Sequence, residues 1–252
     1  MRLSSVALAT TLLLNLPAYP ADALTVVMLS RQRVESADLR ASGHLVRVAA
    51  GGVRTSYAIK LKAHWFPDAL RVFLEIESPS DSRAHILLTM RPDGQNTIQI
   101  AHPGDATPSA LPPDKWSNGP LGDGFSYEDF LEPQYFWASQ ALVERTKYGA
   151  RNCDVVKSTP GTADRTRYAE VRTWLDHNIG FPVYAEKTLK GTGTVKEFTY
   201  FGLRHNGGIW SASQVEAKVR GHAGSTLLII DHGSAKAKLE LSEFSAEQLT
   251  HF

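Results

Sequence analysis

The sequence predicts a mainly β fold with a few short helices (α+β), in which the strands pair antiparallel. Between residues 166 and 230, strand-length segments with alternating apolar and polar residues are separated by short turns rich in Gly and Asn. This spacing is typical of an antiparallel β-meander. The front half alternates in the same way, with apolar side chains at every second position, as in Leu70, Val72, Leu74 and Ile76.

The first residues have the layout of a secretory signal peptide. A positive start at Arg2 precedes an apolar run from Leu3 to Leu16, and Ala21-Asp22-Ala23 has the pattern of a cleavage site. A buried helix or a membrane anchor is the alternative, but the run is shorter than the roughly 20 residues that span a bilayer. We therefore expect cleavage after Ala23, export in soluble form, and a single domain over residues 24–252.

The charge balance and the cysteine count exclude several classes of protein. The chain has 27 basic and 26 acidic residues, a net charge of +1, which gives no reason to expect nucleic acid or an anionic membrane as the main partner. The single cysteine, Cys153, excludes an internal disulfide. We expect Cys153 to be a small buried residue in a strand, because no histidine beside it would lower the pKa of its thiol.

The front half begins with one short helix and continues with strands. The helix is expected within residues 25–40, where apolar residues recur among charged ones. Turn residues such as Pro67-Asp68 and Pro92-Asp93-Gly94 then separate segments of strand length. The strands are expected at residues 43–50, 54–66, 69–78, 83–90 and 96–102.

The middle of the chain has a different character. Residues 103–124 are rich in Pro and Gly and are expected to form a long surface loop. Ser126 and Asp129 have the spacing of a capping box, which predicts a short helix at residues 127–131. Pro133 then interrupts it, and a strand or helix follows at residues 139–147. A connection this long is usually a lid or a binding element.

The back half consists of strands alone. A strand begins near Cys153, and five more form the meander. The five are expected at residues 166–176, 181–190, 194–205, 209–220 and 225–232.

A search for catalytic or metal-binding patterns returns none that is convincing. There is no GxSxG nucleophile motif, and the nine histidines have no zinc-ligand spacing. Residues 190–196 resemble a phosphate loop but lack its spacing, so a hairpin turn is expected. The acidic pairs Glu75/Glu77 and Glu128/Asp129 are interpreted as a solvated strand face and a helix start. The sequence therefore predicts no catalytic residues, no metal and no cofactor.

Three motifs in order resemble the LolA-like family of outer-membrane lipoprotein-sorting proteins, within the LolA/LolB/RseB-like superfamily. They are the GFSYEDF stretch (Gly124–Phe130), the strand end Trp174-Leu175-Asp176, and the turn Gly207-Gly208-Ile209-Trp210. The resemblance extends over residues 40 to 250. It implies an unclosed antiparallel β-barrel of about eleven strands, capped by helices or a lid loop.

The resemblance also implies a function. It predicts a periplasmic, non-catalytic carrier of lipids or lipoproteins in outer-membrane lipoprotein sorting or lipid transport. Its partners would be lipid or lipoprotein acyl chains, an inner-membrane transporter or an outer-membrane acceptor, and the protein is expected to be a monomer. An envelope-stress sensor or partner-binding module on the same fold is the alternative. An enzyme would need a convergent polar cluster, which the sequence does not show.

Strand parity predicts which residues face a lipid cavity. Ordinary core packing is the alternative for each of them. The predicted lining residues are Tyr57, Ile59, Leu61, Val72, Leu74, Ile76, Phe198, Tyr200 and Trp210. The predicted lid residues are Phe125, Tyr127, Phe130, Tyr135, Phe136 and Trp137.

Overall fold

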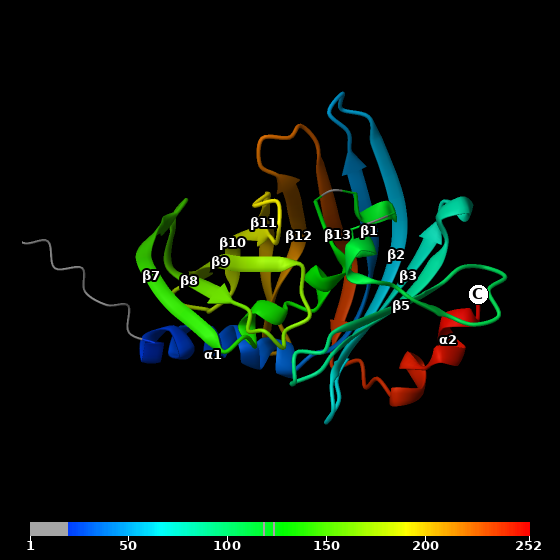
Figure 1. Cartoon of the computed structure of the whole chain (residues 1–252), viewed down its shortest axis with the longest axis horizontal. Coiled ribbons are helices and arrows are strands. Elements are labelled where there is room, and N and C mark those ends of the chain that lie inside the picture. The colour runs from blue at the N-terminus through cyan, green and yellow to red at the C-terminus, as the bar shows by residue number, and fades with distance from the viewer. Residues whose placement is uncertain (1–19, 118, 123) are drawn as a thin grey trace, which may run out of the picture.

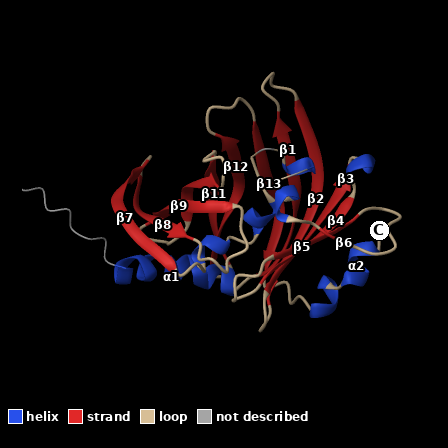
Figure 2. Cartoon of the chain, in the orientation of Figure 1, coloured by secondary structure: helices blue, strands red, loops and turns tan. Residues whose placement is uncertain are grey.

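The computed structural model describes residues 20–252 except Asn118 and Asp123, and it is built on one antiparallel sheet with short helices (Figures 1 and 2). Residues 1–19 of the predicted signal peptide lie outside the described residues. The strands are β1 Asp38–Val48, β2 Arg54–Trp65, β3 Leu70–Ser78, β4 Ala84–Met90, β5 Thr97–Ala101, β6 Ser109–Ala110, β7 Ser139–Tyr148, β8 Arg151–Thr159, β9 Tyr168–Asp176, β10 Pro182–Leu189, β11 Val195–Asn206, β12 Ile209–Val219 and β13 Ser225–Ala235.

All thirteen strands belong to a single sheet that does not close. Their order is β6-β5-β4-β3-β2-β1-β13-β12-β11-β10-β9-β8-β7, so β6 and β7 are the two edges. Figure 1 shows the sheet curling from β7 on the left to β5 on the right. The predicted class, a mainly β unclosed antiparallel barrel, is confirmed, although the sheet has thirteen strands rather than about eleven.

The predicted meander is confirmed, and the first strand joins it to the front half. Strands β9 to β13 pair in chain order, each with the next. Strand β1 pairs with β13 on one side, where Val48 is opposite Ser225, and with β2 on the other. The front and back halves of the sheet are therefore held together by the pairing of the first strand with the last.

Two α-helices flank the sheet. Helix α1 (Pro20–Glu35) packs against β7 and β8, and α2 (Ala246–Thr250) packs against β4 and β5. The prediction of a helix within 25–40 was wrong at its end, because residues 38–40 pair with 62–64 as the start of β1. Ala23, the predicted cleavage position, is a buried residue of α1. Within the described residues, no helix is long and apolar enough to cross a membrane.

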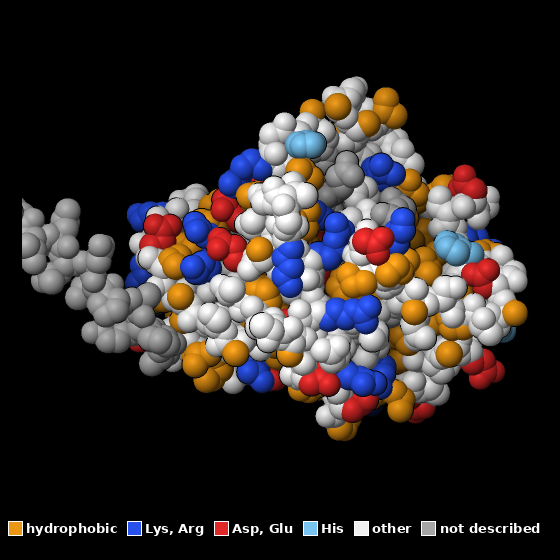
Figure 3. All heavy atoms as spheres, viewed as in Figure 1, with side chains coloured by type: hydrophobic (Ala, Val, Ile, Leu, Met, Phe, Trp, Pro, Cys, Tyr) orange, Lys and Arg blue, Asp and Glu red, His pale blue; other side chains and the backbone are white. Residues whose placement is uncertain are grey.

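The sheet buries apolar side chains on both faces, but with different partners. Its concave inner face carries the main core, to which β2, β3 and β4 contribute most residues. On the convex outer face, Phe73 and Leu87 are covered by the C-terminal segment through Leu239, Phe244 and Leu249. Cys153 is buried, as predicted, and burial raises the pKa of its thiol. Basic and acidic side chains are interspersed on the surface in Figure 3.

The connection between β6 and β7 does not stay on the surface. We call residues 113–137 the inner segment; it contains four short 3-10 helices, Pro113–Lys115, Gly119–Leu121, Tyr127–Phe130 and Pro133–Tyr135. The predicted surface loop at 103–124 is wrong in its second half, because Trp116 and Leu121 are fully buried in the main core. An apolar inner face that must be covered explains why this Pro- and Gly-rich stretch turns inward.

Candidate functional site

The inner face of the sheet brings most of the predicted lining residues together. The residues from β2 and β3 and Phe198 from β11 are all buried in the main core, and Tyr200 is half-buried against it. Trp210 lies apart from this set, where its ring is 5.0 Å from that of His205. The inner face is therefore a continuous apolar wall contributed by strands from both halves of the sheet. The residues of β2 and β3 are Tyr57, Ile59, Leu61, Val72, Leu74 and Ile76.

The predicted lid residues lie in the inner segment and pack on this wall. Phe125 meets Phe198 edge to face, with ring centroids 5.4 Å apart, and Phe136 stacks on Trp65 at 5.2 Å. Most of the predicted set is buried, and Phe130 and Phe136 are half-buried. Trp137 belongs to a smaller cluster with Tyr168 and Val171. The space in front of the wall is thus filled by the protein's own aromatic side chains. The buried members are Phe125, Tyr127, Tyr135 and Trp137.

The inner segment is also attached to the sheet by a buried ion pair. Asp129 accepts hydrogen bonds from Lys187 Nζ of β10 at 2.7 Å and from the Tyr168 hydroxyl of β9 at 2.8 Å. The two charged side chains are only 3% and 2% exposed. The Lys187 ammonium also lies 4.5 Å from the centroid of the Phe198 ring. With water excluded, separating the two groups would leave uncompensated buried charges, so the pair opposes displacement of the segment.

Glu128, the neighbour of Asp129, is fully buried in the same place. Its carboxylate accepts hydrogen bonds from the Thr166 hydroxyl at 2.6 Å and from the backbone N–H of Arg167. Burial, with a smaller contribution from the charge of Asp129, raises the pKa of Glu128 to about 7. Interpreting Glu128 and Asp129 as only a helix start was therefore incomplete: they do begin the short helix, but both point into the core.

Lys196 of β11 is a second buried lysine, and no carboxylate of the described residues forms an ion pair with it. Its side chain is 2% exposed, and its ammonium donates to the Ser117 hydroxyl at 3.3 Å. The Arg167 guanidinium donates to the same hydroxyl. Burial lowers the pKa of Lys196. The buried charged cluster, as we use the term, consists of Ser117, Ser126, Glu128, Asp129, Thr166, Arg167, Tyr168, Lys187 and Lys196.

Sequence reasoning missed this cluster although a signal for part of it exists. Val183, Ala185 and Lys187 share one face of β10, and Lys196 shares a face of β11 with Phe198. A lysine at an apolar position of an alternating strand indicates a buried charge. The convergence of three separate segments on one point has no such signal in the sequence.

The inner segment has one more ionic attachment, to helix α1. Arg33 donates two hydrogen bonds to the carboxylate of Glu132, at 2.8 and 2.7 Å. Both side chains are about one-fifth exposed, at 20% and 19%. Helix α1, β10 and β11 thus hold the inner segment from different sides.

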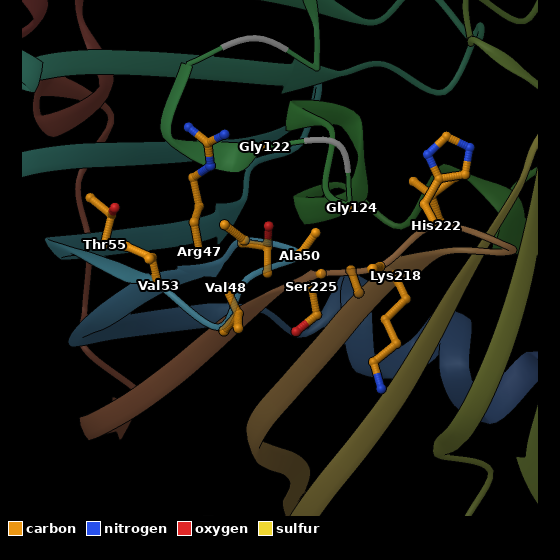
Figure 4. Close-up of a pocket in the computed structure, with 16 residues that line it drawn as sticks. Arg47, Val48, Ala50, Val53, Thr55, Gly122, Gly124, Lys218, His222 and Ser225 are labelled. Carbon is orange, nitrogen blue, oxygen red and sulfur yellow. The ribbon is translucent and has the colours of Figure 1, made fainter.

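A pocket of about 370 Å³ opens at the end of the sheet where the β1–β2 and β12–β13 turns lie (Figure 4). Its lining includes the buried residues Ala217 and Val219 of β12, together with Gly122 and Gly124 of the inner segment. Figure 4 shows Arg47 and His222 rising on the side of the inner segment, whereas Lys218 points the opposite way. Among the described residues that line it, none carries a carboxylate.

The chemistry available is that of an apolar wall with a polar end. In the described part of the chain, no three His, Cys, Asp or Glu side chains are grouped so that they could hold a metal ion. The acids and lysines of the buried charged cluster are already paired with groups of the protein itself. The apolar wall is the largest feature that a ligand could use, provided that the inner segment moves away.

Comparisons with solved structures agree with this architecture. A domain from Vibrio parahaemolyticus described as an outer membrane lipoprotein-sorting protein domain superposes with a TM-score of 0.82 at 18% identity, covering 92% of this chain and 99% of that one. A DUF1329 family protein from Desulfovibrio piger gives 0.81 at 15% identity, covering 92% and 99%. A LolA superfamily protein from Nitrosomonas europaea gives 0.69 at 13% identity, covering 90% and 99%.

Comparisons of sequence give fewer matches. No curated protein matches the sequence. A model of a family described as "Uncharacterized protein" matches residues 69–251, most of the chain from β3 to the C-terminal helix. The protein therefore has the fold of the LolA superfamily, as the motifs suggested, and belongs to the family of uncharacterized proteins that this model describes.

Proposed function

We propose that this protein is a non-catalytic carrier that binds the acyl chains of lipids or lipoproteins on the inner face of its sheet. The observation that carries the proposal is the continuous apolar wall of an unclosed sheet, covered by one chain segment. We further propose that it works in the periplasm after cleavage behind Ala23, in outer-membrane lipoprotein sorting or lipid transport. The description of the similar Vibrio domain as a lipoprotein-sorting protein supports this role.

Binding on the wall requires the inner segment to be displaced, because its aromatic side chains occupy the space. An acyl chain would exchange its own contacts for those of residues such as Phe125 and Phe136. Each methylene moved out of water contributes about 0.8 kcal/mol. Since the aromatic contacts and the Asp129–Lys187 pair are lost in the exchange, the net free energy is much smaller than this sum. Such compensation suits a carrier that must release its cargo.

The first experiment tests binding directly. Native mass spectrometry of protein purified with its envelope fraction should show bound lipid, and a fluorescent fatty acid should bind saturably. In a series of fatty acids, affinity should rise by up to about fourfold per methylene until the chain outgrows the wall. Absence of lipid together with absence of probe binding would show that the protein is not an acyl carrier.

A matched pair of variants places the binding on the inner face. Leu88 and Leu87 are neighbours in β4, 0% and 6% exposed, but Leu88 belongs to the main core and Leu87 to the cluster on the outer face. A polar amide on the wall would lie against the acyl chain, so Leu88→Asn should weaken probe binding by about tenfold. Leu87→Asn carries the same change on the other face and should leave the affinity of the folded protein unchanged. Equal effects would contradict binding on the inner face.

A further inference from the structure

The burial of the Lys196 ammonium costs free energy, and its positive charge is only partly compensated by neighbouring groups. Lys196 is 2% exposed, and among the residues that the structure describes no carboxylate lies within ion-pair distance and its hydrogen-bond partner is the neutral Ser117 hydroxyl. Buried charges in proteins are normally paired with opposite charges. A stabilising role does not explain a lysine here, since an apolar residue would fit the inner face of β11 better.

The guanidinium of Arg167 converges on the same hydroxyl. Arg167 and Lys196 both donate to Ser117 Oγ, so two positive charges share a single neutral acceptor. The carboxylates nearby are engaged elsewhere: Asp129 with Lys187, and Glu128 with Thr166. An anionic oxygen close to Ser117 would pair with both cations at once, and charge-assisted hydrogen bonds are about twice as strong as neutral ones.

The pocket at the end of the sheet adjoins this point. Lys196 lies directly opposite Val219 in the β11–β12 register, and Val219 lines the pocket. Side chains of opposed residues on one face stand about 5 Å apart. The third cation, Arg47, projects into the same pocket beside Gly122 (Figure 4), and its guanidinium makes no hydrogen bond or ion pair with the described residues.

We propose that Arg47, Arg167 and Lys196 form an anion site at this end of the inner face, which receives the phosphate-type headgroup of an acyl-chain ligand. The inference rests on the proposed function and deepens it, since it names the ligand as an anionic amphiphile. Its headgroup lies in the pocket, next to the lining residues Ala217 and Val219. Its acyl chain continues along the wall, which begins next to Lys196 at Phe198.

The test compares two lipids of equal chain length, one with a phosphate in its headgroup and one without. Lysophosphatidylglycerol and the matching monoacylglycerol are titrated against a bound fluorescent fatty acid, with inorganic phosphate as a third competitor. We expect the anionic lipid to bind about tenfold more tightly than the neutral one, the effect of one charge-assisted hydrogen bond. If inorganic phosphate displaces the probe, the site also binds the free anion. If it does not, the site is specific for the lipid headgroup.

Variants separate the anion site from the general charge of this end of the sheet. Arg47→Gln and Lys196→Met should each remove the preference for the anionic lipid. The control is Arg54→Gln, which removes the same charge from an exposed residue that does not line the pocket and should keep the preference. Equal affinities of the two lipids for the parent protein would overturn the anion site while leaving the carrier role intact. Failure of both lipids to bind would instead overturn the carrier role.

Discussion

Replacing Asp129 by Asn tests whether the buried ion pair holds the inner segment in place. One carboxylate oxygen of Asp129 accepts from Lys187 and Tyr168, and the other accepts from the backbone N–H of Ser126 at 2.6 Å. An asparagine keeps one acceptor, turns the other into a donor, and leaves the Lys187 ammonium without its counter-charge. With side chains 3% and 2% exposed, water cannot take over. The expected loss of stability is about 3–5 kcal/mol.

Urea unfolding at pH 7, followed by tryptophan fluorescence, measures this loss. The same loss should lower the midpoint temperature of thermal unfolding by about 6–20 °C, because each kcal/mol corresponds to about 2–4 °C in a chain of this size. The control is Asp68→Asn, because Asp68 pairs with Arg71 but is 62% exposed and should contribute at most about 1 kcal/mol. The double variant Asp129→Asn/Lys187→Met removes both charges and should recover much of the loss. If Asp129→Asn costs no more than Asp68→Asn, the pair is not what holds the segment.

Three further predictions follow from burial and charge. The pKa of Glu128 is raised from 4.5 to about 7 by burial, so its contribution to stability is fully present below pH 4.5 and is lost as the pH rises to about 7. That loss is about 3 kcal/mol, and urea titrations at several pH values should show it in the parent but not in Glu128→Gln; parallel curves would refute it. Lys196→Met should raise the melting temperature, because it removes a buried cation that has no carboxylate partner among the described residues; a lower value would show that Lys196 stabilises the fold. Phe244→Ala should destabilise by about 3–5 kcal/mol in urea, since Phe244 is 3% exposed against the outer face. Leu241→Ala, at 56% exposure, is its control and should be nearly neutral; similar losses in both would mean that the cluster on the outer face does not stabilise the sheet.

Strand alternation made most of the sheet predictable. Ile76 lies between the polar neighbours Glu75 and Glu77 in the sequence, and the face of the sheet to which it points follows from the pleat alone. The end of the first helix was not predictable, because Asp38 to Arg40 become strand only through pairing with β2, a partner remote in sequence. The local sequence pattern does not show whether a segment will be helix or strand when the outcome depends on pairing with another segment.

The candidate site was predictable only in its apolar part. The alternation of residues along the strands indicated that Ile59 and Phe198 lie on the same face of the sheet. In the fold, both belong to the main core. Trp116 and Leu121 gave no signal, because an irregular loop has no period that marks its buried residues. Glu128 and Lys196 have no relation in the sequence, and they belong to one cluster only because the inner segment turns back onto strands that follow it.

The pairing of β1 with β13 also bears on when the chain can fold. Val48 is paired with Ser225, so the centre of the sheet joins a residue that is synthesised early with one that is synthesised late. Strands β3 and β4 are also synthesised early, but their outer-face residues Phe73 and Leu87 are covered only after Leu249 has been made. Because such long loops must close before these contacts form, the topology predicts slow folding. The core can therefore be completed only after β13 and the C-terminal segment have been made.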